Sequence, residues 1–157
     1  MADIRDPENT LLLDITHGRV VIEMMPDEAP GHVARIKELV REGFYDGVVF
    51  HRVIDGFMAQ TGDPTGTGRG GSGQKLAAEF NREPHLRGTV SMARARDPNS
   101  ADSQFFICFD DATFLDRKYT AWGRVIDGMD NVDKIKRGEP VDNPDKIVKV
   151  QVAADAA

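Results

Sequence analysis

Residues 50–63 of the chain are FHRVIDGFMAQTGD, and the chemistry that we expect of the protein follows largely from these residues. It places Arg52 and Gln60 among apolar side chains, and it contains no evident nucleophile, acid–base pair or metal cluster. A second cluster, SMARA at residues 91–95, is followed by SQFFICF at residues 103–109. Together these segments predict an apolar groove with one fixed cation, which suits a reaction in which no covalent bond is broken.

Composition limits the classes of protein that fit. The 157 residues suffice for about one domain, and the net charge of −6 argues against nucleic acid or an anionic membrane as a partner. No apolar stretch approaches the roughly 20 residues that span a bilayer, and residues 1–10 lack the apolar core of a secretory signal. Cys108 is the only cysteine, so an internal disulfide and a zinc cysteine cluster are excluded, and we expect a cytoplasmic protein.

Hydrophobic periodicity predicts a mainly β fold with two helices. Residues 1–9 form a loose lead-in to a single domain at 10–157. Helical spacing of Val33, Ile36, Leu39 and Val40 predicts an amphipathic helix from Pro30 to a stop at Gly43. A shorter helix begins near Met129 and ends by Gly138. Strands are expected at 10–15, 19–24, 48–54, 57–61, 89–93, 104–109, 122–126 and 146–152, which indicates a closed or nearly closed antiparallel sheet capped by the helices.

Strand alternation assigns Gln104, Phe106 and Cys108 to one face of their strand and the intervening residues to the other. Met58 and Gln60 likewise share a face. A glutamine beside an aromatic ring is unusual in a sealed core, because its amide needs hydrogen-bond partners. We therefore expect these residues at the wall of a cleft.

Arg52 has two possible roles on this evidence: an exposed or core-edge ion pair, or the cation of that cleft. Its apolar neighbours and Gln60, which could orient the planar guanidinium, make the second role competitive. We expect His51 to be a structural packing residue. We expect Cys108 to be a small buried hydrophobe and not a thiolate nucleophile.

GTGRGG at residues 66–71 matches the letters of a dinucleotide-binding motif, but no βαβ unit surrounds it. We interpret it as a flexible loop that lines a substrate edge. The four histidines lack ligand-like spacing, so no metal site is expected.

These motifs, in this order, resemble those of the cyclophilin family of peptidyl-prolyl isomerases. The resemblance rests on FHRVI, GFM and QTGD within residues 50–63, on SMA at 91–93 and on SQFFI at 103–107. It implies a closed eight-stranded antiparallel barrel with a helix over each end. It also implies a cofactor-free enzyme that accelerates rotation about X–Pro bonds in unfolded or flexible polypeptides, and so assists protein folding. Nothing in the sequence demands more than a monomer, and we expect one.

The resemblance also implies roles for individual residues. Arg52 would be the catalytic arginine, positioned by Gln60 and Gln104. The substrate would be bound by Phe57, Met58, Ala93, Arg94, Gln104, Phe106, Phe114, Leu115 and Tyr119. The best-known eukaryotic members have tryptophan at the position of Phe114, histidine at Tyr119 and asparagine at Arg94. Since that tryptophan is linked to cyclosporin binding, we expect cyclosporin to bind weakly.

Two other functions remain open on the sequence. A proline-binding or chaperone-like module would need only the apolar pocket, so the joint presence of Arg52, Gln60 and Phe106 favours the enzyme. A nucleotide-dependent enzyme that uses the loop at 66–71 has little support.

Overall fold

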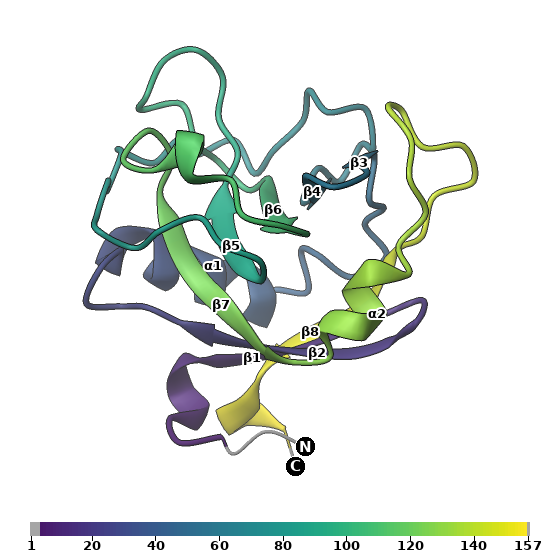
Figure 1. The fold of residues 1–157 in the computed structure, drawn as a ribbon. Coiled ribbons are helices and arrows are strands. Elements are labelled where there is room, and N and C mark those ends of the chain that lie inside the picture. Colours follow the sequence, from purple (N-terminus) through teal and green to yellow (C-terminus); the bar gives the residue numbers. More distant parts are fainter. Residues whose placement is uncertain (1–3, 157) are drawn as a thin grey trace.

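Eight antiparallel strands form one curled sheet in the computed structural model, which describes residues 4–156 (Figure 1). The strands are β1 Thr10–Ile15, β2 Gly18–Met24, β3 Arg52–Ile54, β4 Met58–Thr61, β5 Thr89–Met92, β6 Phe105–Cys108, β7 Ala121–Asp127 and β8 Ile147–Val152. The α-helices are α1 Pro30–Arg41 and α2 Met129–Asp133, and short 3₁₀ turns cover Pro7–Asn9 (η1), Thr113–Leu115 (η2) and Ala153–Asp155 (η3).

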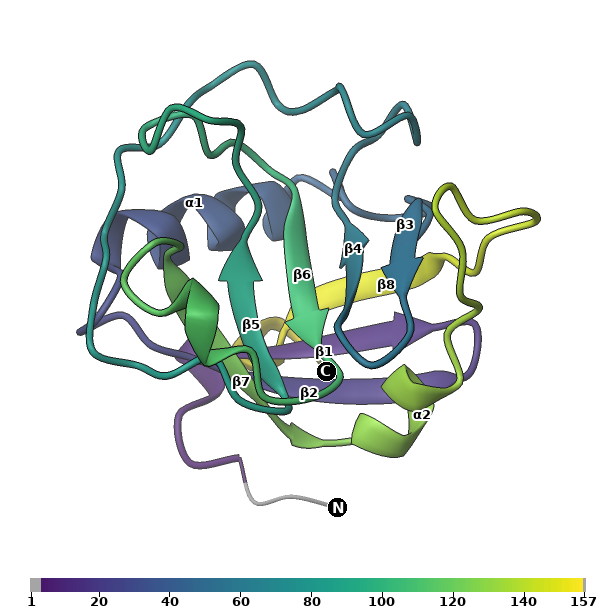
Figure 2. The same ribbon diagram turned by 45° about the horizontal axis from the view of Figure 1, so that its top comes forward.

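The sheet has the strand order β3-β4-β6-β5-β7-β2-β1-β8. The β1–β2 hairpin turns at Thr16 and His17, as the sequence predicts. Figure 2 shows β3, β4, β6 and β5 running across the direction of β1, β2 and β8, so the sheet curls around an interior. Alternate residues of each strand point into that interior, which holds the larger apolar cluster of the chain.

Helix α1 buries the predicted stripe of Val33, Ile36, Leu39 and Val40 against this interior. Pro30 occupies the first turn, where its missing N–H costs nothing. The residue before the helix has no side-chain cap. Instead Glu79 accepts hydrogen bonds from the amides of the second and third helical residues, at 3.0 and 2.8 Å. A distant loop therefore caps the helix.

Helix α2 is shorter than expected: it ends at Asp133 and not near Gly138. The amide of Lys136 donates to the carboxylate of Asp145 at 2.8 Å and not to a helical carbonyl. Val132 is nevertheless buried in the interior cluster, so the helix packs an apolar side chain against the sheet.

The prediction of a closed barrel is wrong: the structure is an open half-barrel. The end strands β3 and β8 share no ladder, and the strand expected at 48–54 is regular only over Arg52–Ile54. Within the described residues, the gap is crossed by isolated bridges between Val49 and Lys146 and between Val53 and Gly138. The connection between α2 and β8 contains Pro140 and Pro144, which have no N–H to donate to a continuous ladder.

Part of the predicted lead-in contacts the helix. Residues 1–3 lie outside the described residues, and Pro7–Asn9 forms the turn η1. Glu8 pairs with Lys37 at 2.8 Å and with Arg41 at 3.0 Å. Among residues 4–156, no helix has both the length and the apolar composition needed to span a bilayer.

Candidate active site

The register of the sheet aligns four residues across four strands. Arg52 on β3 lies opposite Gln60 on β4, Gln60 lies opposite Phe106 on β6, and Phe106 lies opposite Ser91 on β5. The interior cluster contains Phe105 and Ile107, the two odd-numbered residues of β6. Residues of the opposite parity therefore lie on the outer face, as strand alternation predicts.

The outer face carries a second, smaller apolar cluster that includes Met58, Phe106, Cys108 and Leu115. Beside it lies a cavity of about 290 Å³. Its lining is Arg52, Phe57, Met58, Gln60, Ala93, Arg94, Phe106, Phe114, Leu115 and Tyr119. Ten of the eleven residues predicted from the sequence thus meet at one cavity, and Gln104 contacts it through Gln60. No serine, cysteine, histidine or carboxylate is among these lining residues.

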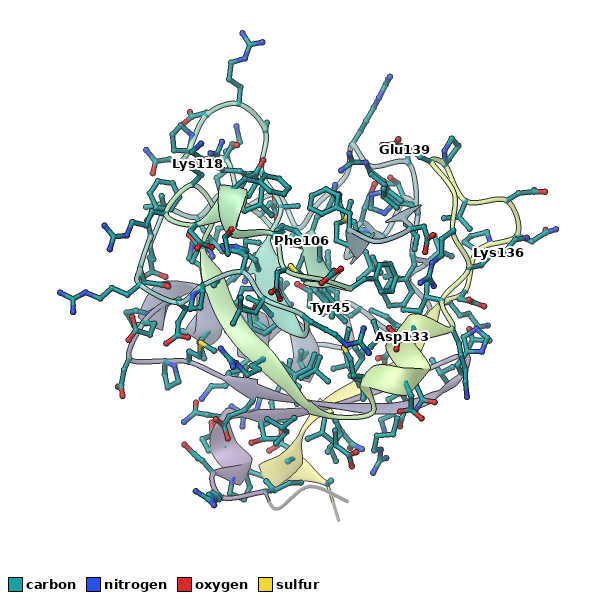
Figure 3. The ribbon with its side chains drawn as sticks, in the orientation of Figure 1. Tyr45, Phe106, Lys118, Asp133, Lys136 and Glu139 are labelled. Atoms are coloured by element: carbon teal, nitrogen blue, oxygen red, sulfur yellow. The ribbon has the colours of Figure 1, made fainter. Side chains whose placement is uncertain are left out.

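Aromatic rings form the walls of the cavity. Phe106 packs edge-on against Tyr119, with 5.9 Å between the ring centroids. The ring centroids of Phe57 and Phe114 lie 5.6 Å apart at the rim, where Phe114 is 65% exposed. In Figure 3 Phe106 lies between the segment labelled at Lys118 and the segment labelled at Glu139, which rise on either side of it.

A chain of amide hydrogen bonds fixes the guanidinium of Arg52. Its Nη1 donates to the side-chain oxygen of Gln60 at 3.2 Å, and the Gln60 amide donates to Gln104 at 2.9 Å. Gln104 in turn donates to the carbonyl oxygens of Gly68 and Gly70, both at 3.0 Å. The glutamines that looked out of place in a core therefore connect the arginine to the glycine-rich loop.

That loop is organised by Asp63. The fully buried Asp63 carboxylate accepts hydrogen bonds from the amides of Thr65, Thr67, Gly68 and Gly70 at 2.7–3.1 Å. Burial opposes ionisation of this carboxyl, but these hydrogen bonds outweigh it and hold its pKa well below the ordinary value. The loop is thus tied internally, and these amides are already used and cannot cradle a phosphate. It does line a groove edge, because a second cavity of about 290 Å³ includes Gly68 and Gly70.

Arg94 braces the rim between these two cavities and lines both of them. Its guanidinium carbon lies 4.6 Å from the ring centre of Tyr119, and its Nε and Nη2 donate to the carbonyl of Lys118 at 2.9 and 2.6 Å. The amide of Ala93 donates to the carbonyl of Gln104 at 2.9 Å. The arginine therefore supports the tyrosine, and both depart from the eukaryotic pattern.

Beneath the cavity the structure reveals a constellation that the sequence analysis missed. His85 places one ring nitrogen 2.9 Å from the Ser91 hydroxyl and the other 3.0 Å from the Asp116 carboxylate. The distances resemble those of a hydrolase triad, but both His85 and Ser91 are fully buried and cannot reach a substrate. Burial lowers the pKa of His85, which stacks 6.2 Å from Phe106. The group therefore supports the cavity floor.

His51 and Cys108 occupy buried positions, as predicted. Burial lowers the pKa of His51 and raises the pKa of the Cys108 thiol to about 12, so the thiol stays protonated at neutral pH. Among residues 4–156, no group of three or more His, Cys, Asp or Glu side chains is arranged to hold a metal ion.

Glu139 is the other residue that the sequence analysis did not single out. Its carboxylate accepts a hydrogen bond from Nε of Arg52 at 2.5 Å. No motif marks Glu139, because it lies 87 residues from Arg52 in a connection without periodicity. Only an observed contact between the two segments could identify it.

Comparison with known proteins gives consistent results. Residues 10–153 match the family model described as cyclophilin type peptidyl-prolyl cis-trans isomerase/CLD. A protein of Brucella suis biovar 1, named probable peptidyl-prolyl cis-trans isomerase, is 54% identical in an alignment that covers 98% of this chain and 87% of the relative.

Two solved structures are similar along nearly the whole chain. The cyclophilin AquaCyp293 from Hirschia baltica superposes with a TM-score of 0.90 at 36% identity, covering 97% of this chain and 76% of that one. A Cryptosporidium parvum cyclophilin type peptidyl-prolyl cis-trans isomerase, solved in the presence of the dipeptide Ala-Pro, has a TM-score of 0.85 at 28% identity. That alignment covers 91% of this chain and 98% of the other.

Proposed function

We propose that this chain, which belongs to the cyclophilin-type peptidyl-prolyl cis-trans isomerase family and is a peptidyl-prolyl cis-trans isomerase, uses Arg52 to accelerate rotation about X–Pro bonds in unfolded or flexible polypeptides. One observation carries the assignment of Arg52. Its guanidinium, oriented by Gln60, lines an apolar cavity that contains no nucleophile or acid–base pair among its lining residues.

The reaction requires no covalent intermediate. Amide resonance opposes rotation with a barrier of ~18–20 kcal/mol, and X–Pro bonds exchange over roughly tens to hundreds of seconds. A reduction of the barrier by about 7 kcal/mol would accelerate exchange by about 10⁵-fold. An apolar pocket disfavours the charge-separated form of the planar amide, which raises the ground state relative to the twisted one.

Arg52 acts on the twisted state. As rotation breaks the resonance, the prolyl nitrogen becomes pyramidal and its lone pair localises. A guanidinium N–H that donates near this nitrogen interacts more strongly with the twisted state than with the planar one, and only such a difference accelerates the step. The apolar residues Phe57, Met58, Phe106 and Leu115 hold the proline ring in place during the rotation.

The substrate class is supported by the dimensions and chemistry of the site. An apolar cavity of about 290 Å³ bordered by fixed polar groups fits a proline ring with its flanking peptide units. The Cryptosporidium parvum cyclophilin solved in the presence of Ala-Pro supports prolyl peptides as ligands. Because the groove is open, a role in the folding of other proteins follows from access to unfolded chains.

The test is NMR exchange of an X–Pro peptide, which needs no coupled protease. We expect the wild type to accelerate exchange at catalytic concentrations and Arg52→Ala to lose activity by about 100-fold or more. Arg19→Ala, which removes an exposed strand arginine paired with Asp14, is the matched control and keeps full activity. Near-wild-type turnover of Arg52→Ala would contradict the catalytic role of Arg52.

The same experiment addresses the alternative of a binding module. A module that only holds proline-containing segments would bind the peptide without accelerating its exchange, and its affinity would survive Arg52→Ala. The nucleotide-dependent alternative has no phosphate site, because amides of the glycine-rich loop already donate to the Asp63 carboxylate.

We also propose that the protein acts as a monomer in the cytoplasm and binds cyclosporin weakly. Among residues 4–156 only three large apolar side chains are exposed, which is little for an obligate interface. The single cysteine of the chain fits a reducing compartment. Analytical ultracentrifugation tests the oligomeric state, and inhibition titration tests the affinity for cyclosporin.

A further inference from the structure

We propose that Glu139 is a positioning residue for the isomerase: its carboxylate fixes the plane of the Arg52 guanidinium so that the remaining N–H groups face the bound prolyl peptide. This inference rests on the proposed role of Arg52. It concerns the connection between α2 and β8, which is far from the groove motifs in the sequence. In space this connection rises beside the groove at the position labelled Glu139 in Figure 3.

The guanidinium is held on two of its three nitrogens. Nε donates to Glu139 at 2.5 Å, and Nη1 donates to Gln60 at 3.2 Å. The described residues provide no hydrogen-bond acceptor for Nη2. A guanidinium has five N–H groups in one plane, so two acceptors at different nitrogens define that plane and leave three N–H groups for a ligand.

The backbone places Glu139 with little freedom. Gly138 exchanges two hydrogen bonds with Val53, both at 2.8 Å, and the amide of Val141 donates to the carbonyl of His51 at 3.2 Å. The two residues that flank Arg52 in sequence are therefore the two that anchor the segment around Glu139. The carboxylate consequently follows any movement of β3 and keeps its position relative to the arginine.

Two neighbours strengthen this placement. Gly138 has a φ of +153°, and a Cβ there would lie 2.9 Å from both the Pro140 oxygen and the Val141 Cα, so the tight bend depends on glycine. Arg137 donates to the carbonyls of Asp133 and Ile135 and lies over the ring of Phe109, 4.1 Å from its centre. The segment is thus braced on the side of α2 as well as on the side of β3.

The exposure of both side chains indicates that the contact between Arg52 and Glu139 orients the guanidinium and adds little to the stability of the fold. The side chains of Arg52 and Glu139 are 41% and 56% exposed, and an ion pair so accessible to water contributes little to the free energy of unfolding. A free arginine side chain samples many rotamers, and each one that points away from the groove is unproductive. Fixing the guanidinium in advance raises the fraction of bound peptide that meets the donor correctly.

The experiment compares Glu139→Ala, Glu139→Gln and the control Asp142→Asn in the exchange assay. Asp142 lies in the same segment and is exposed, and it has no hydrogen bond or ion pair with Arg52, so its substitution removes one negative charge without touching the guanidinium. We expect Glu139→Ala to lower kcat about tenfold with KM nearly unchanged. Glu139→Gln, whose amide oxygen can still accept from Nε, should recover part of the loss, and Asp142→Asn should match the wild type.

A direct readout is the Arg52 Nε–H resonance in ¹⁵N-labelled protein. We expect this proton to exchange slowly with water in the wild type and to become fast-exchanging in Glu139→Ala, with the unfolding free energy unchanged. An unchanged kcat, a loss confined to KM, or an increased kcat in Glu139→Ala would each overturn the inference, the last because it would mean that the carboxylate withholds the arginine from the substrate. These outcomes differ from failure of the proposed function, in which the wild type is inactive or Arg52→Ala is fully active.

Discussion

Strands β4 and β6 have two faces built from similar apolar residues, and the two faces have different roles. On the inner face, Phe105 and Ile107 are enclosed by the curled sheet and by α1. On the outer face, Met58 and Phe106 meet polar side chains and an open cavity. Burial alone therefore does not define a core here, because Met58 and Phe106 are as buried as Phe105 and yet border a site.

The largest effect is expected from truncation of adjacent phenylalanines on opposite faces. Phe105→Ala removes a ring from a sealed interior and should lower the free energy of unfolding by about 3–5 kcal/mol, while the molecules that stay folded retain activity. Phe106→Ala should destabilise less, because the cavity on its side is already open, but should strongly weaken peptide binding. Urea unfolding and peptide affinity, measured on both variants, separate the role of the inner face in stability from the role of the outer face in binding. If both variants lost the same peptide affinity, the two faces would not be independent.

Asp63→Asn tests whether the glycine-rich loop belongs to the groove. The replacement keeps one acceptor oxygen but cannot accept from the three amides, of Thr67, Gly68 and Gly70, that now bond to the second oxygen. We expect a loss of about 2–3 kcal/mol in unfolding free energy and a reduced activity, since Gln104 is anchored to this loop. Asp97→Asn, an exposed carboxylate that accepts one amide hydrogen bond, is the control and should change neither quantity appreciably.

Acid should weaken the protein through buried histidines on both sides of the sheet. Burial lowers the folded-state pKa of His32 in the first turn of α1 and of His85 beneath the groove, so the unfolded chain binds more protons below its own histidine pKa of about 6.5. Stability from these groups is therefore complete above about pH 6.5 and is lost as the pH falls below it.

Urea unfolding at a series of pH values measures this loss of stability. We expect the unfolding free energy of His85→Gln to depend less steeply on pH than that of the wild type. A slope that is unchanged in His85→Gln would assign the acid sensitivity to other groups. The pKa of Asp63 is also lowered on folding, which adds a second loss only as the pH falls below about 4, near the ordinary aspartate pKa.

The smallest effect concerns the rim. Phe114→Trp adds a larger ring and an N–H donor at an exposed position of the outer face. One additional hydrogen bond is worth about 0.5–1.5 kcal/mol, so cyclosporin should inhibit the variant about 2–12-fold more strongly, with isomerisation of short peptides nearly unchanged. An equal affinity for cyclosporin in wild type and variant would contradict this role of the rim position.

Most of the secondary structure could be predicted because its signals are local. The hairpin of β1 and β2 follows from period-two alternation around a glycine-containing turn, and α1 follows from period 3.6 between Pro30 and Gly43. The open edge could not be predicted in this way. Whether β3 meets β8 depends on how a long connection with two prolines lies across the gap, and local periodicity carries no information on such a contact.

The candidate site likewise has features that local sequence signals predict and features that depend on contacts between distant segments. The residue types of the groove can be read from the sequence alone, since Arg52, Gln60 and Phe106 lie in recognisable motifs on defined strand faces. Three features of the site depend on contacts that form only in the folded chain. These three residues lie opposite one another on neighbouring strands, the Asp63 carboxylate ties the glycine-rich loop, and Glu139 contacts the arginine from 87 residues away. The physical reason is that the preference for a strand or helix arises between near neighbours in the chain. The orientation of a catalytic side chain depends instead on partners that folding brings together from distant segments.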